Sequence, residues 1–136
     1  MTNNISIDLA NITYNIVNTL DIYITDNDYA FANISIDHND AYYCLGTEDM
    51  REDGKIALSG DKSQWLINSI VTSIQNQKLD NAPTKLIIKI SISLNDNRKI
   101  ALNQASIGSD TIIEIIDCLS RECDEFLFLD IFKNFI

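Results

Sequence analysis

Side chains that commonly perform chemistry are few in this sequence and stand apart from one another. His38 is the single histidine, and it lies with Asp37 and Asp40 in a polar stretch that predicts a turn. A nucleophilic relay needs its base held beside the nucleophile, and the spacing around His38 supplies no such partner. We therefore interpret His38 as a solvated turn residue, and we expect the chain not to be an enzyme.

The three cysteines, Cys44, Cys118 and Cys123, do not have the spacing of a zinc site. Zinc ligands come in close pairs, whereas Cys118 and Cys123 would lie on different faces of a helix. The Asp-rich turns do not make a calcium loop, because an EF-hand loop starting at Asp37 would place Tyr42 where the sharp turn requires glycine. There is no glycine-rich phosphate loop either, so the sequence predicts no metal and no cofactor.

Carboxylates are the abundant polar group, and they are unevenly distributed. The whole chain has a formal net charge of −10. Residues 1–61 hold eleven acids against Arg51 and Lys55, a net of −9, while residues 62–136 hold nine acids and eight bases, a net of −1. Concentrated acid repels nucleic acid and attracts cationic surfaces over long range. The pattern therefore favours a basic protein partner.

Nucleic acid and membrane are both disfavoured as direct partners. Four bases fall on one predicted hairpin, which is a poor footprint for a polyanion on a chain of net charge −10, so we interpret them as keeping a sheet face soluble; they are Lys85, Lys89, Arg98 and Lys99. No stretch approaches the ~20 apolar residues of a membrane span, and the opening residues lack the pattern of a secretory signal. With an odd number of cysteines, we expect a cytoplasmic protein.

The hydrophobic pattern predicts a single α+β domain over residues 1–136, with a mostly antiparallel sheet of about five or six strands packed by two to four helices. Alternating apolar residues predict strands, and apolar residues three and four apart predict helices. The expected strands cover residues 29–37, 41–45, 85–94 and 99–102, with a further alternation at Ile22 and Ile24. The expected helices cover residues 61–77, capped by Asp61, and the segment after Gly108.

Three segments are harder to assign. Residues 8–20 have helical spacing, but their β-branched content leaves a strand open. Residues 46–60 predict a charged loop, in which residues 55–58 could form a short strand. The tail, residues 124–136, could be a last helix or a buried strand. Its aromatic residues predict core packing in preference to a dimer contact, and the oligomeric state stays open; these residues are Phe126, Phe128, Phe132 and Phe135.

One stretch combines acidic residues with exposed aromatic and sulfur side chains. Aromatic anchors with a polar rim are typical of protein-binding patches, and carboxylates around them would orient a basic partner. We predict that this partner-binding patch consists of Asp37, Asp40, Tyr42, Tyr43, Glu48, Asp49, Met50, Glu52 and Asp53. The alternative is an acidic face that only keeps the domain soluble.

These features favour a bacterial immunity protein, which would neutralise a basic toxin such as a nuclease by tight binding. A phage-type DNA mimic that inhibits a restriction or CRISPR effector is the alternative, although a mimic would be expected to spread acid over most of its surface. A small enzyme subunit or ligand-binding module is a third possibility, without support from any motif in the sequence.

Overall fold

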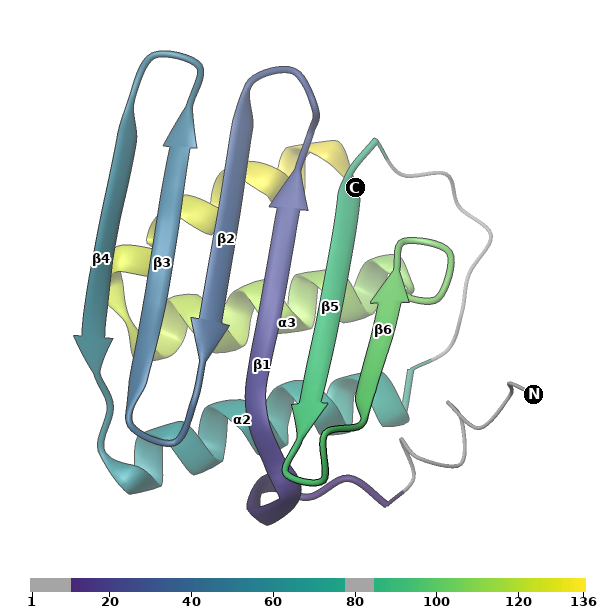
Figure 1. Cartoon of the computed structure of the whole chain (residues 1–136). Helices are drawn as coiled ribbons and strands as arrows, with labels where there is room; N and C mark the ends of the chain where they lie inside the picture. Colours follow the sequence, from purple (N-terminus) through teal and green to yellow (C-terminus); the bar gives the residue numbers. More distant parts are fainter. Residues whose placement is uncertain (1–10, 78–84) are drawn as a thin grey trace.

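The chain forms one six-stranded antiparallel sheet with its helices on one side, as a computed structural model shows (Figure 1). The structure describes residues 11–77 and 85–136. The strands are ordered β4-β3-β2-β1-β5-β6. The elements are η1 (Tyr14–Ile16), β1 (Val17–Thr25), β2 (Ala30–Ile36), β3 (Asp40–Thr47), β4 (Arg51–Ala57), α2 (Gly60–Gln75), β5 (Ile87–Leu94), β6 (Lys99–Asn103), α3 (Ser109–Glu122) and η2 (Asp124–Phe135). The predicted α+β arrangement is confirmed.

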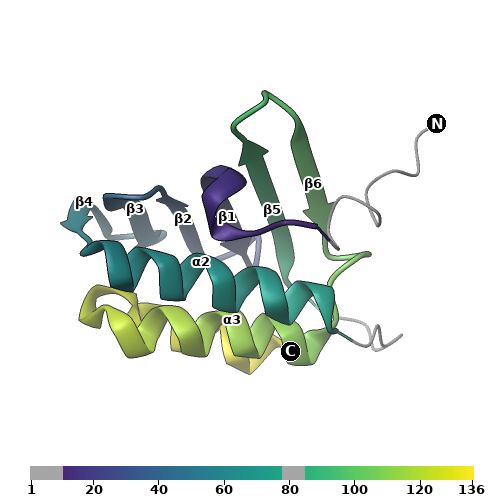
Figure 2. The same cartoon turned by 90° about the horizontal axis from the view of Figure 1, so that it is seen from below.

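The two α-helices and the 3₁₀-helix η2 lie on the same side of the sheet. Figure 1 shows them crossing behind the strands, and Figure 2 shows α2 and α3 together on one side of the sheet. Every second strand residue points towards them, so the residues that pair across the sheet form apolar rows. Ile22 of β1, for example, pairs with Ile34 of β2 and with Ile90 of β5, and all three are buried. The helices contribute residues such as Leu66 and Ile116, also fully buried.

The opposite face of the sheet is not covered by any described helix. The residues between the apolar ones point to this side, which we call the open face. They include the paired residues Tyr42 and Lys55 of β3 and β4, and the paired residues Tyr23 and Lys89 of β1 and β5. A half-solvated antiparallel sheet of this kind explains why the strands alternate so clearly in the sequence.

The structure assigns one segment that the sequence left open, and it corrects one expectation. Residues 8–20 were left open between helix and strand; the part from Val17 belongs to β1, where Leu20 continues the alternation of Ile22 and Ile24, and residues 8–10 lie outside the described part. The stretch expected to be a loop, residues 46–60, contains the full strand β4. Its residues are mostly exposed, and Glu52 and Gly54 occupy helical-side positions where the inner strands carry apolar residues, so the alternation is missing from the sequence.

The helical predictions need smaller changes. The N-cap of α2 is Ser59, whose side chain accepts a hydrogen bond from the Lys62 amide, and Asp61 lies in the first turn instead. The tail forms the helix η2, with Phe126 and Phe132 fully buried. The aromatic tail therefore contributes to the core, as predicted, while Phe128 and Phe135 are only partly buried.

Candidate functional site

The β1–β2 turn presents acidic side chains at one end of the sheet, the upper end in Figure 1. Asp26 organises this turn: its carboxylate accepts hydrogen bonds from the amides of Asp28, Tyr29 and Ala30 at 3.1, 2.8 and 2.9 Å. Partial burial raises the pKa of Asp26, but the amide hydrogen bonds lower it further, so the net pKa is below its ordinary value. Asp26 therefore stays ionised, and the neighbouring Asp28 side chain is exposed.

The β3–β4 turn lies at the same end of the sheet (Figure 1). It is closed by a 2.7 Å hydrogen bond from the Thr47 amide to the Met50 carbonyl. This leaves Glu48 and Asp49 exposed at the tip, and the Met50 side chain is 75% exposed. A bend of this kind holds the two carboxylates outwards, where they are free to contact another molecule.

A hollow of about 320 Å³ joins the two turns. Its aromatic lining consists of Tyr23, Tyr29 and Phe31, with Asp28 and Glu48 on opposite turns at its edge. Tyr29 is 48% exposed. We call this surface the acidic end, and define it as Asp26, Asp28, Tyr29, Glu48, Asp49 and Met50.

The structure separates the predicted patch residues into several places. Glu48, Asp49 and Met50 belong to the acidic end. Asp37 lies in the β2–β3 turn and Asp40 begins β3, at the other end of this strand, which is eight residues long and so spans about 24 Å. The Asp37 carboxylate accepts hydrogen bonds from the amides of Asn39 and Asp40, both at 2.8 Å, and thus stabilises its own turn.

Tyr42 and Asp53 point to the open face. Tyr42 is 45% exposed, whereas Asp53 is engaged by its neighbours: Cys44 donates a hydrogen bond to it, and Arg51 Nε lies 3.1 Å from Asp53 Oδ1. These two hydrogen bonds lower the pKa of Asp53. The same contact with Asp53, followed by burial, raises the pKa of Cys44. The Cys44 thiol is thus less easily ionised than a free cysteine.

Tyr43 and Glu52 point to the helical side. The Tyr43 ring packs edge-on against Phe126, with ring centroids 5.8 Å apart, and its hydroxyl donates a 3.5 Å hydrogen bond to Glu52. Desolvation, then the charges of Glu52 and Glu125, raise the pKa of Tyr43. Tyr43 therefore joins β3 to η2 and is less available to a partner than predicted.

Sequence reasoning missed the contribution of Asp26, Asp28 and Tyr29 to the acidic end. The signal was available, because successive turns of an antiparallel meander alternate between its two ends. The first and third turns must then meet, which brings the turn at residues 26–29 beside the turn at residues 47–50. Proximity along the chain instead favoured Asp37 and Asp40, which belong to the opposite end.

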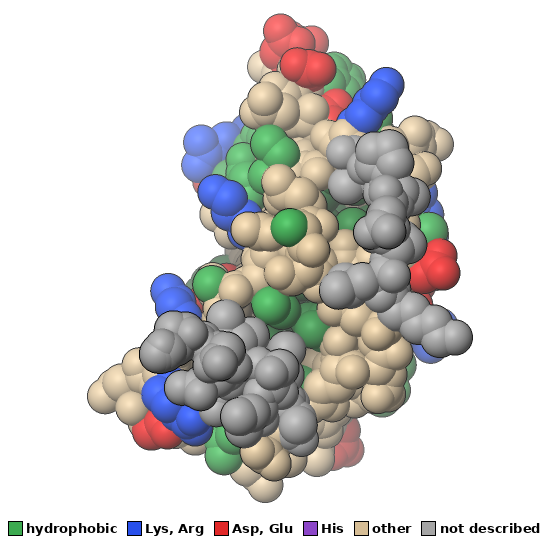
Figure 3. Space-filling model, turned by 90° about the vertical axis from the view of Figure 1, so that its right-hand side faces the viewer, with side chains coloured by type: hydrophobic (Ala, Val, Ile, Leu, Met, Phe, Trp, Pro, Cys, Tyr) green, Lys and Arg blue, Asp and Glu red, His purple; other side chains and the backbone are tan. Residues whose placement is uncertain are grey.

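The near-neutral second half of the chain consists of two charged regions of opposite sign. Residues 85–99 carry four bases and one acid, a net of +3, while residues 108–136 carry seven acids and two bases, a net of −5. Figure 3 shows Lys and Arg side chains gathered along the left-hand side, which is the open face of the sheet, and Asp and Glu at the upper end and along the helical side. The acidic end thus lies on a molecule with a basic hairpin at its other edge.

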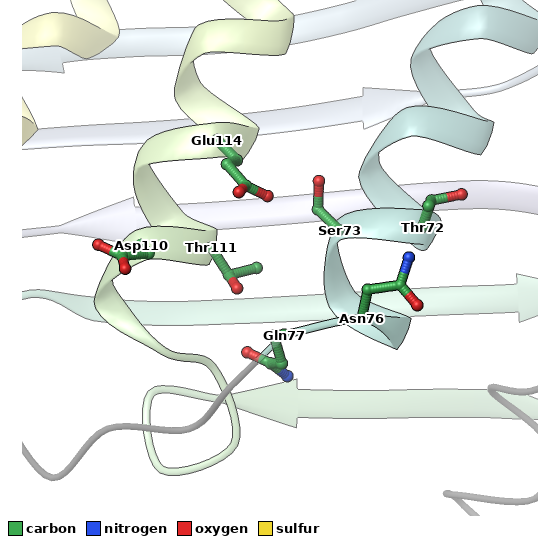
Figure 4. A pocket seen from close by; sticks show the side chains of 7 residues that line it. All are labelled: Thr72, Ser73, Asn76, Gln77, Asp110, Thr111 and Glu114. Atoms are coloured by element: carbon green, nitrogen blue, oxygen red, sulfur yellow. The ribbon is translucent and has the colours of Figure 1, made fainter.

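A hollow of about 430 Å³ lies between α2 and α3 and is lined by polar side chains (Figure 4). Glu114 and Ser73 point towards one another across it, while Asp110 is turned away. Gln77 is fixed there by hydrogen bonds to the Ser106 carbonyl and from the Gly108 amide, both 2.8 Å. In residues 11–77 and 85–136, no group of three or more His, Cys, Asp or Glu side chains could hold a metal ion.

Comparisons with known proteins give no match: no family model, no curated protein and no solved structure matches this chain. Within the described residues, no helix is both long enough and apolar enough to cross a membrane. The function must therefore be argued from the geometry alone.

Proposed function

We propose that the protein is a non-enzymatic binding protein that uses its acidic end to capture a basic protein, and that it acts as an immunity protein against a cationic toxin such as a nuclease. One observation carries the proposal. Two turns that are distant in the sequence place Asp28 and Glu48 at the edge of one aromatic hollow, with Asp49 exposed beside Glu48, and neither turn contains a basic residue.

This arrangement suits tight capture of a cationic surface. The exposed carboxylates would steer and orient the partner during encounter. Tyr29 and Met50 are exposed beside them and would supply contact area that excludes water once the partner has docked. A nuclease needs a basic cleft to bind phosphates, so an acidic end inserted there would occupy the position of its substrate.

The charge distribution supports localised docking more than mimicry of DNA. A DNA mimic presents carboxylates along most of its surface, whereas this molecule has a hairpin of net charge +3 on the same sheet as the acidic end. Bases at that edge would repel a DNA-binding cleft that extended along the whole sheet. The proposal therefore limits the interface to the two turns and the hollow between them.

The test needs a specific partner, and a toxin-domain protein encoded beside this chain is the one to use. Reversing Asp28, Glu48 and Asp49 to Lys should slow association by about 10- to 100-fold and remove protection of cells that express the toxin. A matched control reverses three acids of the helical layer, Glu114, Glu122 and Asp124, to Lys. Stopped-flow association and thermal unfolding of both variants would be measured. Equal association rates for the two variants would overturn the proposal.

A further inference from the structure

The strand β4 forms an open edge of the sheet. It is the last strand in the order β4-β3-β2-β1-β5-β6, and no described element lies beyond it (Figure 1). It is seven residues long, and most of them are exposed. An unpaired edge of this length is a template for another strand, and proteins commonly shorten, cover or charge such edges to prevent pairing.

The backbone groups that β4 leaves unpaired can be assigned from the hairpin. Hydrogen bonds run from the Thr47 amide to the Met50 carbonyl and from the Leu58 amide to the Asn39 carbonyl. Hydrogen-bonded pairs alternate along an antiparallel ladder, and the register pairs Tyr43 with Gly54. The even-numbered residues of β4 therefore bond to β3. The amides and carbonyls of Arg51, Asp53, Lys55 and Ala57 point outwards.

The charges along this edge are complementary to themselves. If a second copy of β4 pairs antiparallel about Gly54, Asp53 lies opposite Lys55 of the other copy, and Lys55 lies opposite its Asp53. Both residues point to the open face, so each pair brings opposite charges into direct contact. A register shifted by two residues in one direction places Asp53 opposite Asp53 of the other copy, and the shift in the other direction places Lys55 opposite Lys55. Both registers bring like charges together and are therefore repulsive.

We infer that β4 is a homodimerisation edge, at which two copies join antiparallel about Gly54 into one continuous sheet. The two-fold symmetry makes the same seven residues serve both copies. The four outward-facing residues form the hydrogen-bonded pairs, and Gly54 meets its counterpart at the axis, where opposing Cα atoms come closest, about 4.5 Å apart. On the inner side, a Cβ at this position would overlap the Tyr43 hydroxyl and ring, so a larger residue would displace Tyr43.

This dimer leaves the acidic end of each copy free. Antiparallel pairing of β4 turns the second copy upside down, so the two acidic ends point in opposite directions. Two partners could then bind without contact between them. The inference does not depend on what the acidic end binds, and it holds or fails separately from the proposed function.

The association is expected to be weak. Stable complexes bury about 1,200–2,000 Å², which is more than one pair of seven-residue strands provides. Two chains of net charge −10 also repel one another, although a Debye length of about 8 Å at physiological salt confines that repulsion. The dimer should therefore appear as a rise in the average molar mass with increasing protein concentration, measured at physiological salt.

Charge exchange within the pair gives the sharpest test. In Lys55→Asp, carboxylates meet at both contacts, and in Asp53→Lys, ammonium groups meet at both, so each variant alone should dimerise at least about tenfold more weakly than the parent. Mixed together, the two variants restore opposite charges at both contacts and should form a one-to-one heterodimer. Only the register centred on Gly54 predicts this recovery.

The matched control is Lys99→Asp on the other edge strand, β6. It makes the same charge change as Lys55→Asp at an exposed edge residue and should leave dimerisation unchanged. Sedimentation equilibrium up to about 1 mM, with circular dichroism to verify the fold, measures all four proteins. The inference is overturned if the parent is monomeric throughout, or if Lys55→Asp associates as Lys99→Asp does. If Asp53→Lys fails to fold through loss of its contacts with Arg51 and Cys44, the comparison of Lys55→Asp with Lys99→Asp decides.

Discussion

The acidic end and the β2–β3 turn are built on the same local motif but differ in what surrounds it. In each, an aspartate carboxylate accepts hydrogen bonds from the amides that follow it: Asp26 in the first case, Asp37 in the second. Such turns are typical of aspartate. The motif by itself therefore does not identify a binding surface, and the difference must come from the neighbouring elements.

The β2–β3 turn is bonded to the rest of the molecule. The Ser63 hydroxyl of α2 donates a 2.7 Å hydrogen bond to the Asp37 carbonyl, and the Leu58 amide bonds to the Asn39 carbonyl. His38 stacks on Tyr14 with ring centroids 4.3 Å apart, and its Nε2 lies 2.7 Å from the Val17 carbonyl. These contacts give the turn a structural role, and His38, the one histidine, takes part in that role.

Among the described residues, no hydrogen bond or ring contact joins the acidic end to a helix. The hydrogen bonds of the acidic end remain within the two turns, and Asp28, Tyr29, Glu48 and Asp49 are exposed there. Two similar acidic turns thus divide into one that stabilises the fold and one that is free to bind. Stability and association measurements should separate the two turns.

The largest effect on stability is expected from Ser63→Ala. Ser63 is fully buried, and its removal leaves the Asp37 carbonyl without this donor. Losing a buried hydrogen bond in this way costs about 1–3 kcal/mol of the free energy of unfolding. The matched change at the acidic end, Met50→Ala, removes a side chain that is 75% exposed and should cost less than about 0.5 kcal/mol. Urea unfolding measures both, and equal losses would contradict the division between the two turns.

Much of this division follows from residue patterns that the sequence displays, and part of it does not. Alternation correctly predicts β2, β5 and β6, because one face of each is buried against helices while the other is solvated. It fails at β4, where Glu52 and Gly54 take helical-side positions and Ile56 alone packs against the core from that strand. The burial of Ser63 could not be predicted, because its contact with Asp37 joins residues that are 26 positions apart and depends on how α2 packs.

The candidate site shows the same limit. Glu48, Asp49 and Met50 were predicted because two acids and a methionine stand next to one another in the sequence. Asp53 was predicted on charge alone, but Arg51 and Cys44 already engage it. The sequence shows which residues are charged. Which neighbouring side chain neutralises a given charge depends on the register between strands, and only the paired strands define that register.

A smaller effect is expected from Asp26→Asn, and it should depend on pH. The folded-state pKa of Asp26 is depressed, so ionised Asp26 stabilises the fold at pH values above its unfolded pKa, near 3.9, and this contribution is lost as the pH falls through the folded pKa. Because the turn is partly solvated, the loss should be less than about 1 kcal/mol. Thermal unfolding from pH 7 to pH 2 should bring the parent and Asp26→Asn curves together at the acid limit. A constant gap down to pH 2 would show that the charge of Asp26 does not contribute.

The smallest effect on stability, and the most direct comparison of the two turns, comes from neutralising exposed acids without reversing them. Asp28→Asn with Glu48→Gln should leave the free energy of unfolding within about 0.5 kcal/mol of the parent but make association with a basic partner less sensitive to salt, because fewer charges steer the encounter.

The control is Asp40→Asn at the start of β3. Asp40 belongs to the predicted patch but lies outside the acidic end. Association rates of the three proteins, measured at closely spaced salt concentrations from about 20 mM to about 500 mM, give the slope for each. A slope that decreases as much for Asp40→Asn as for the double variant would place the interface along the whole of β3, because the two ends of that strand would then contribute equally to steering.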